Sequence, residues 1–382
     1  MRFLKPVAFF CIFLIALVAI PKQTGTYGET ETELKTEIET ELKVSELELE
    51  IEPKLESESV PLPVPNLPNL QVSRIYPNEV GHIMILMYHG LHETNPGPYD
   101  RLTDDFRQDL ETLYNQGYRL TSLSDIIHNN ISVPAGKSPV AITFDDGLSS
   151  AFSLIETDGV LSPRPGTAVY IMMEFAEAHP DFGLTAAFFV NSAPEPFSGA
   201  GTMQERFAFL IENGFEIGSH TISHPNMTRL GVAAIRREVG GQYAYLKARL
   251  PNYYEPEFFA YPYGSIPSSG SRDLILEGEY LGEEYRHSAA FRVGNTNVPP
   301  LPHHVNYNPL HVSRVNATDE STSQRVVPDM GHFFRLYANN PGLRYISDGN
   351  SNSITVSHNR AHEVNREALG EMSFFIYYSL IE

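Results

Sequence analysis

Tryptophan is absent from this chain of 382 residues, and cysteine occurs only once, at position 11. A single cysteine excludes a disulfide scaffold and any zinc site built from several thiolates. Basic residues are also scarce, with 27 Lys and Arg against 47 Asp and Glu, which gives a formal net charge of −20. Because neutralising phosphates requires a basic face, this acidity argues against a nucleic-acid partner. The length permits one large barrel domain or two ordinary domains.

Residues 1–22 have the pattern of an export signal, with Arg2 and Lys5 ahead of an apolar run from Val7 to Ile20. This run is shorter than the roughly 20 residues that a membrane-spanning helix needs. A cleaved signal peptide is therefore favoured, and an uncleaved membrane anchor remains the alternative because no clean cleavage motif follows. In both cases we expect a protein that is secreted or anchored to the outer face of the cytoplasmic membrane.

Residues 23–71 are expected to form a disordered, extended linker. Between Glu29 and Glu58 lie twelve Glu and three Lys, a net charge of −9 that repels itself and does not pack. A proline-rich stretch from Val60 to Pro68 follows and is typical of a stiff spacer. The globular part is then expected over residues 72–382, as a monomer.

Strand-like and helix-like segments alternate from residue 82 to about residue 290. Short apolar runs bounded by turn residues predict buried strands at 82–89, 139–144, 184–190, 215–219 and 258–261. Helical spacing of apolar residues, with glycine or a capping residue at the ends, predicts helices at 104–116, 122–128, 168–178, 202–213 and 231–250. Such alternation predicts an α/β fold with a parallel sheet, closed or nearly closed into a barrel.

Polar residues follow several of these strands at the carboxyl ends, where parallel barrels carry their function. They are His89, Asp145, Asp146, Asn191, His220, His224 and the segment Tyr261–Gly264. Two adjacent carboxylates leaving a strand cannot point the same way, so one can bind a cation while the other serves as a base. Two His four residues apart can reach one ion. Each motif alone is commonly a plain turn or a coincidence, but together they favour a site for Zn²⁺ or a similar divalent metal.

The segments Thr143–Gly147, His220–His224 and Tyr261–Gly264 resemble the first three motifs of the polysaccharide deacetylases, carbohydrate esterase family 4. The resemblance covers roughly residues 80–350. It implies a distorted (β/α) barrel and metal-dependent hydrolysis of N-acetyl groups on glycans. Carried over residue by residue, it implies Asp145 as the catalytic base and Asp146, His220 and His224 as the metal ligands, with Zn²⁺ as the favoured ion.

The sequence departs from this family pattern in two places. Ala260 stands where the third motif usually has Arg, and no Leu-x-His-Asp motif supplies the general acid near the end of the chain. Instead, the upstream segment Ile85–His89 resembles the permuted arrangement of exopolysaccharide deacetylases, which implies His89 as the acid. The alternative is a buried His satisfied by the backbone. Arg314 is a candidate for the cation that tunes Asp145, and a surface ion pair is the alternative.

Substrate contacts must come from smaller rings, since Trp is absent. Tyr263 is a candidate for donating its backbone N–H to the oxyanion of the reaction. Stacking against sugar rings is expected from one or two residues among Tyr261, Tyr263, Tyr253, Tyr254 and Phe291. We expect His303 and His304, in a proline-rich loop, to be exposed.

These observations predict a hydrolase that removes N-acetyl groups from N-acetylglucosamine-type residues of a cell-wall or extracellular polysaccharide. One alternative is a catalytically weakened member that only binds glycan, which the missing Arg favours and the intact Asp and His pairs oppose. Another is hydrolysis of a non-glycan amide or an O-acetyl ester. The acidity of the chain suits a neutral glycan better than a polyanionic one.

Overall fold

The computed structural model describes residues 75–94, 96–97, 99–293, 301–317 and 328–378. The expected export segment (1–22) and linker (23–71) lie outside the described residues, so the domain boundary at residue 72 stays a prediction. Within the described part of the chain, no helix has the length and apolar character needed to cross a membrane.

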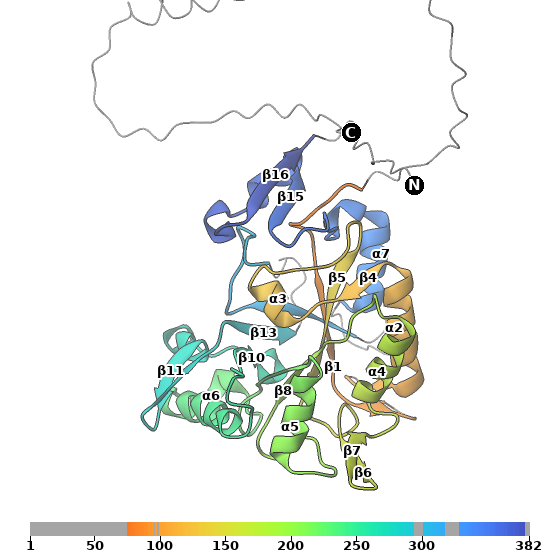
Figure 1. Ribbon diagram of the computed structural model, residues 1–382. Coiled ribbons are helices and arrows are strands. Elements are labelled where there is room, and N and C mark those ends of the chain that lie inside the picture. Colours follow the sequence, from red (N-terminus) through yellow and green to blue (C-terminus); the bar gives the residue numbers. More distant parts are fainter. Residues whose placement is uncertain (1–74, 95, 98, 294–300, 318–327, 379–382) are drawn as a thin grey trace, which may run out of the picture. The chain divides into compact units, whose positions relative to one another are not determined.

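A closed ring of seven parallel strands forms the centre of the fold (Figure 1). Around the ring the strands are β1 (Met84–Tyr88), β14 (Val312–Asn316), β13 (Ala289–Val293), β10 (Phe258–Ala260), β9 (Glu216–Ser219), β8 (Ala187–Val190) and β5 (Ser138–Asp145). Pairing of β5 with β1 closes the ring. The predicted distorted (β/α) barrel is therefore confirmed.

One further parallel strand, β4 (Tyr118–Leu120), joins the barrel from outside the ring. It pairs with the first residues of β5, whereas β8 pairs with the last ones on the same edge. The two strands therefore share one edge of β5. At the amino end of β5 the partner on this edge is β4, and at the carboxyl end it is β8.

Successive side chains along a strand point to opposite faces of the sheet, so the barrel has one apolar layer inside the ring and another outside it. In β1, Ile85 belongs to a cluster inside the ring with Phe189 and Phe291, while its neighbour Leu86 packs in a second cluster beneath the surrounding helices. All eight residues of β5 are buried, as expected for a strand that is covered on both faces. The uninterrupted apolar runs in the sequence follow from this double burial.

Six α-helices surround the ring among the described residues: α2 (Thr103–Asn115), α3 (Leu123–Ile127), α4 (Ala168–Ala178), α5 (Met203–Glu212), α6 (Val232–Lys247) and α7 (Met330–Asn339). Five of them match predicted helices to within a few residues. Capping side chains mark the starts of α3, α4, α5 and α7. Thr202 and Glu205, for example, form a reciprocal capping box at the start of α5. Helices α2 and α4 lie side by side on one flank of the barrel (Figure 1).

Four short strand pairs and several turns lie around the barrel. They are the pairs β2 (Leu91–His92) with β3 (Arg101–Leu102), β6 (Leu154–Thr157) with β7 (Val160–Pro163), β11 (Glu277–Tyr280) with β12 (Glu283–Arg286), and β15 (Ser353–Ser357) with β16 (Ser373–Tyr377). Short 3₁₀ turns occupy Met227–Arg229, Pro262–Gly264, Ser269–Ser271, Asp273–Ile275, Pro341–Leu343, His358–Glu363 and Arg366–Leu369. In Figure 1, β15 and β16 lie at the top, and the β6–β7 hairpin, which follows β5, lies at the bottom.

The prediction that His303 and His304 are exposed is wrong, because they are only 1% and 4% exposed. The ring of His303 bonds to the carbonyl oxygen of Glu79 at 2.7 Å and to the side chain of Asn129 at 2.9 Å. Burial lowers the pKa of His303 to about 4. These partners are far away in sequence, which is why the composition of the loop gave no sign of them.

Candidate active site

A cavity of about 390 Å³ lies at the carboxyl ends of the barrel strands. Its lining includes the residues predicted to act as base, acid and metal ligands, together with Tyr261, Tyr263 and Arg314. The full lining is Met87, His89, Tyr99, Asp145, Asp146, His220, His224, Tyr261, Tyr263, Gly264, Val293 and Arg314. Residues separated by more than 200 positions in sequence therefore face one space.

Asp146, His220 and His224 form a compact group that could hold a metal ion. One donor atom from each lies within 4.8 Å of the others. The Asp146 Oδ1 atom is 3.5 Å from Nε2 of His220 and 3.4 Å from Nε2 of His224. Two imidazole nitrogens and a carboxylate oxygen converge here, a donor set that suits Zn²⁺ and leaves coordination positions open.

The surroundings of His220 keep it in the form that a metal ligand needs. Its Nδ1–H donates to the carbonyl oxygen of Ala260 at 2.8 Å, which leaves the Nε2 lone pair directed toward Asp146. Burial, reinforced by His224 and Arg314 and opposed by Asp145, lowers the pKa of His220 to about 4. The ring is therefore neutral at physiological pH, and the residues present fit a divalent metal.

The loop between His220 and His224 is held by side chains that do not line the cavity. Asn191, which follows β8, donates its amide to the carbonyl oxygens of His220 and Thr221. Glu238 on α6 accepts from the backbone N–H of Ser223 at 3.0 Å. Asn191, placed at the site by the sequence, therefore acts on the histidine loop and not on the cavity.

Backbone conformations in the left-handed region are concentrated around this cavity. Eight described non-glycine residues have positive φ, and four of them belong to the site: Asp146, Thr221, His224 and Tyr263. Such conformations cost about 1 kcal/mol or more each and persist where the surrounding structure enforces them. At Asp146 (φ 71°) the turn lets its carboxylate face the histidine pair, while Asp145 stays inside the barrel. The two adjacent carboxylates thus point in different directions.

Asp145 is paired with Arg314 from β14 in the interior of the barrel. Two guanidinium nitrogens donate to the two carboxylate oxygens at 2.6 and 2.7 Å, and both residues are 2% exposed. Burial alone would raise the pKa of Asp145, but Arg314, with His220 and His89, more than offsets this and holds the pKa below its ordinary value. Asp145 is therefore ionised at neutral pH.

Ala260 and Arg314 both belong to strands of the ring. The side chain of Ala260 packs in the cluster inside the barrel, where an Arg at this position would also point. Here the guanidinium comes from β14 instead and also donates to the hydroxyl of Thr143 at 3.1 Å. The surface ion pair that remained the alternative for Arg314 is thus not what the structure shows.

His89 lies directly after β1 and approaches Oδ2 of Asp145, one of the two oxygens that accept from Arg314. Its Nε2 is 4.0 Å from Oδ2 of Asp145, and its ring lies 5.4 Å from that of Tyr99. Its side chain is 17% exposed. Tyr99, which the sequence did not single out, comes from a loop whose sequence carries no strand or helix pattern.

The tyrosines differ in what they can offer to a substrate. Tyr263 is 69% exposed, and its ring packs edge-on against His224 with the centroids 4.4 Å apart. Tyr261 is 1% exposed, packs in the cluster beneath α6, and donates its hydroxyl to the carbonyl oxygen of Leu310. Tyr261 therefore has no free ring face for stacking, although it borders the cavity.

The other stacking candidates lie away from the cavity. Phe291 is completely buried inside the barrel, and the hydroxyl of Tyr254 bonds to the backbone of Ile217. Tyr253 is 73% exposed but precedes β10, at the amino end of that strand. The exposed ring of Tyr263 is the one from this group that faces the site.

Residues 132–275 match the family described as polysaccharide deacetylase, and the chain therefore contains a domain of this family. The matched range carries Asp145, Asp146, His220, His224 and the Tyr261–Gly264 segment. Membership implies a hydrolase with deacetylase activity. The assignment to the permuted subgroup, which rests on His89, stays a prediction.

Several solved structures are similar to this chain at low sequence identity. A Streptococcus pyogenes deacetylase, PplD, in complex with acetate is 18% identical, with 66% of this chain and 96% of that chain covered and a TM-score of 0.46. IcaB from Ammonifex degensii is 20% identical, with 63% and 94% covered and a TM-score of 0.42. A polysaccharide deacetylase from Bacillus cereus, BC0361, is 16% identical, with 63% and 67% covered and a TM-score of 0.43.

Proposed function

We propose that this protein is an exported, metal-dependent deacetylase that removes N-acetyl groups from N-acetylglucosamine-type residues of a cell-wall or extracellular polysaccharide. The observation that supports this most directly is the division of labour between two adjacent carboxylates in one cavity. Asp146 faces the two histidines, whereas Asp145 is buried, ionised and paired with Arg314. A metal-binding group and a separate base are thus available side by side.

Asp146, His220 and His224 would hold the ion, with Zn²⁺ favoured by the donor set. When bound, the metal would polarise the acetyl carbonyl and acidify a water molecule, which a base as weak as an Arg-paired carboxylate requires. Asp145 accepts the proton of the attacking water at Oδ2, the oxygen that faces His89 and His220. Arg314 keeps this carboxylate ionised and fixed in orientation.

His89 and Tyr263 complete the chemistry at the reacting carbon. His89, on the same side of Asp145 as Oδ2, donates a proton to the leaving amine. The backbone N–H of Tyr263 donates to the oxygen on which negative charge develops. The exposed ring of Tyr263 offers an apolar face to the sugar next to the acetyl group.

The first test separates the base from the metal ligands. Asp145→Asn should abolish acetate release from chitooligosaccharides and retain metal, because Asp145 is not among the grouped donors. His220→Ala should lose both activity and metal. Metal content measured by elemental analysis, together with acetate release, distinguishes the two variants. Full activity in Asp145→Asn would overturn the assignment.

The second test concerns the general acid. His89→Ala should lower kcat by about 10²-fold or more, the usual contribution of general acid–base catalysis. His92→Ala is the matched control, since His92 is exposed and pairs with Asp100 outside the cavity. An unchanged kcat in His89→Ala would assign the acid to another group.

Acetate release with and without added Zn²⁺ also distinguishes the alternatives. A catalytically weakened glycan-binding member would release none from any substrate. The case for that alternative rested on the missing Arg, and Arg314 supplies a guanidinium at Asp145. Release from O-acetyl esters or simple amides, without release from N-acetylated glycans, would favour the hydrolysis of a different bond.

A further inference from the structure

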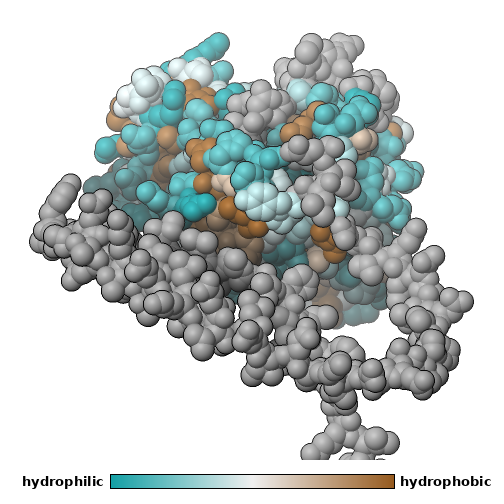
Figure 2. All heavy atoms as spheres, turned by 90° about the horizontal axis from the view of Figure 1, so that it is seen from above, coloured by the Kyte–Doolittle hydropathy of each residue, from teal (hydrophilic) through white to brown (hydrophobic). Residues whose placement is uncertain are grey.

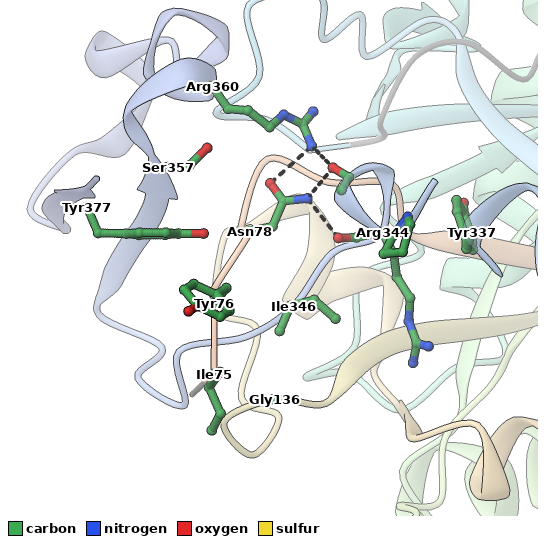
Figure 3. Close-up of a pocket in the computed structure, with 12 residues that line it drawn as sticks. Ile75, Tyr76, Asn78, Gly136, Tyr337, Arg344, Ile346, Ser357, Arg360 and Tyr377 are labelled. Carbon is green, nitrogen blue, oxygen red and sulfur yellow. Dashed lines mark hydrogen bonds between the residues drawn. The ribbon is translucent and has the colours of Figure 1, made fainter. Parts of the chain in front are cut away.

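A second cavity, of about 510 Å³, lies at the other end of the barrel from the candidate active site. Residues 75–78, which lead into β1, form one wall, and β15 and β16 with the turn after α7 form the others (Figure 3). Of its lining residues only Gly136 falls within the range 132–275 that matches the deacetylase family. This cavity is therefore built by the parts of the chain that surround the family domain.

Three tyrosines line the cavity: Tyr76, Tyr337 and Tyr377. Tyr76 is 40% exposed, and its ring lies 6.1 Å from that of Tyr377. Tyr377 reaches from β16 toward the segment of Tyr76 and donates its hydroxyl to the carbonyl oxygen of Pro77 (Figure 3). Tyr337 is 5% exposed, and its hydroxyl has no hydrogen-bond partner within the described part of the chain.

The remaining polar groups brace the wall of the cavity. Arg360 donates to the side-chain oxygen of Asn78 and to the carbonyl oxygen of Gly342, and Asn78 donates to the carbonyl oxygens of Gly342 and Arg344. Figure 3 shows this network joining the β15–β16 region to the lead-in of β1. The cavity is thus preformed, which lowers the entropy cost of binding a ligand.

The charge of the lining is unusual for so acidic a protein. Among the residues that the structure describes, no Asp or Glu lines the cavity. Arg360 is neutralised by Glu363 just outside it, and the guanidinium of Arg344 extends away to lie 3.9 Å from the ring of Tyr118. The cavity therefore offers aromatic faces and neutral polar groups and no counter-charge for a cation.

Exposed hydrophobic side chains occur on the two segments that contribute Ile75, Tyr76 and Tyr377 to this cavity. They belong to two short segments and are Ile75, Tyr76, Phe375, Ile376 and Tyr378. Figure 2 looks onto this end of the molecule and shows hydrophobic residues interspersed with hydrophilic ones. Ile75 and Tyr76, which line the cavity, therefore leave apolar surface accessible to a ligand.

We propose that this cavity is a second glycan-binding site, which takes neutral, N-acetylated pyranose units of the same polysaccharide. Tyrosine faces pack against the C–H faces of sugar rings, and Asn, Ser and Tyr side chains bond to their hydroxyls. A volume of about 510 Å³ is within the usual range for small-ligand sites. The identity of the sugar rests on the proposed function.

The position and charge of the site define its role. The eight residues of β5 separate the two ends of the barrel by about 26 Å, so this site does not extend the catalytic cavity. A deacetylated unit carries an ammonium group, for which the lining has no carboxylate. The site therefore retains the enzyme on polymer that has not yet been processed and releases the product.

The test uses the full chain and compares Tyr76→Ala/Tyr377→Ala with Tyr253→Ala, an exposed tyrosine that lines neither cavity. The double variant should bind insoluble chitin about 10-fold more weakly and deacetylate it correspondingly more slowly. Its kcat/KM on soluble chitotriose should stay within about 2-fold of the unmodified protein, since the catalytic cavity is untouched. Tyr253→Ala should resemble the unmodified protein in both assays.

The double variant could lose binding because it folds less well. Tyr337→Phe avoids this ambiguity, because it removes one hydroxyl and keeps the ring. It should weaken binding of the N-acetylglucosamine hexamer several-fold with an unchanged Tm. The glucosamine hexamer should bind the unmodified protein more weakly than the N-acetylated one. Unchanged chitin binding in the double variant, or equal binding of the two hexamers, would overturn the proposal.

The two proposals fail separately in these assays. Tyrosine-dependent chitin binding without acetate release would remove the proposed function and leave the second site intact. Acetate release together with chitin binding that does not depend on Tyr76 and Tyr377 would overturn the second site and leave the proposed function intact.

Discussion

The ion pair of Asp145 and Arg314 shows how a residue from another strand can supply the guanidinium that is missing at Ala260 in this chain. Both side chains are buried, so the attraction between them acts in a medium far less polarisable than water. Removal of either partner leaves the other charge buried without compensation. The pair therefore ties the fold of the barrel to the protonation state of the proposed base.

Arg314→Met should destabilise the protein by about 3 kcal/mol or more, because it strands the Asp145 carboxylate in the barrel. Arg286→Met is the matched control, since Arg286 pairs with Glu277 and both side chains are largely exposed, at 82% and 70%. Urea unfolding measures both variants. Arg314→Met combined with Asp145→Asn should recover most of the lost stability, and equal losses in the single and double variants would contradict the pairing argument.

At the scale of elements, a short helix closes the amino end of the barrel. Helix α3 has five residues, too few to be stable alone, and it starts at the N-cap Ser122. Glu216 on β9 accepts from the backbone N–H groups of Leu123 and Ser124 at 2.8 and 2.9 Å. A buried carboxyl group from a barrel strand therefore holds the first turn of this helix in place.

This contact predicts a pH dependence of stability. Burial, partly offset by the two backbone hydrogen bonds, raises the pKa of Glu216 from 4.5 to about 7. Between these two values the folded protein keeps a proton that the unfolded chain releases. The contribution of Glu216 to stability is therefore full below pH 4.5 and is lost as the pH rises to about 7.

The variant Glu216→Gln should remove this part of the pH dependence. Its free energy of unfolding, relative to that of the unmodified protein, should rise by up to roughly 3 kcal/mol between pH 4.5 and pH 8. Glu79 has a pKa raised to about 7 by burial as well, so Glu79 titrates in both proteins and cancels in the difference. If the free energies of unfolding of the two proteins changed with pH in the same way, the prediction would be wrong.

The elements recovered from the sequence are those with strong local patterns. The strand expected at 139–144 is β5, and the helix expected at 168–178 is α4 with the same bounds. Strands β13 and β14 were not expected, although β14 carries Arg314. Each carries an Arg within its five residues, which interrupts the apolar run that predicts a buried strand.

At the scale of the whole molecule, the barrel brings the donors of the metal site together only when it is folded. Asp146 follows β5, and the two histidines, some 75 residues later in the chain, follow β9. An ion that binds this group binds the folded state in preference to the unfolded state. Metal binding and folding are therefore linked by mass action.

Removing the metal should lower the Tm. At an ion concentration 100 times the Kd the stabilisation is about 2.7 kcal/mol, which corresponds to a change of roughly 4 °C for a domain of this size. Thermal unfolding with Zn²⁺ and with a chelator measures this shift. His224→Ala should abolish it, whereas His358→Ala, which lies outside the group, should leave it unchanged.

The sequence by itself determined which residue types we propose for the chemistry and which strands most of them follow. Local patterns suffice for this, because burial on both faces and turns at strand ends leave direct marks in sequence. Only the tertiary structure decided that Arg314 meets Asp145, that Tyr99 lines the cavity, and that Tyr261 is occupied in the core. It also brought residues 75–78 to β15 and β16, nearly 300 positions away, to form the second cavity. Such contacts depend on which strands become neighbours when the ring closes, and no local pattern specifies that.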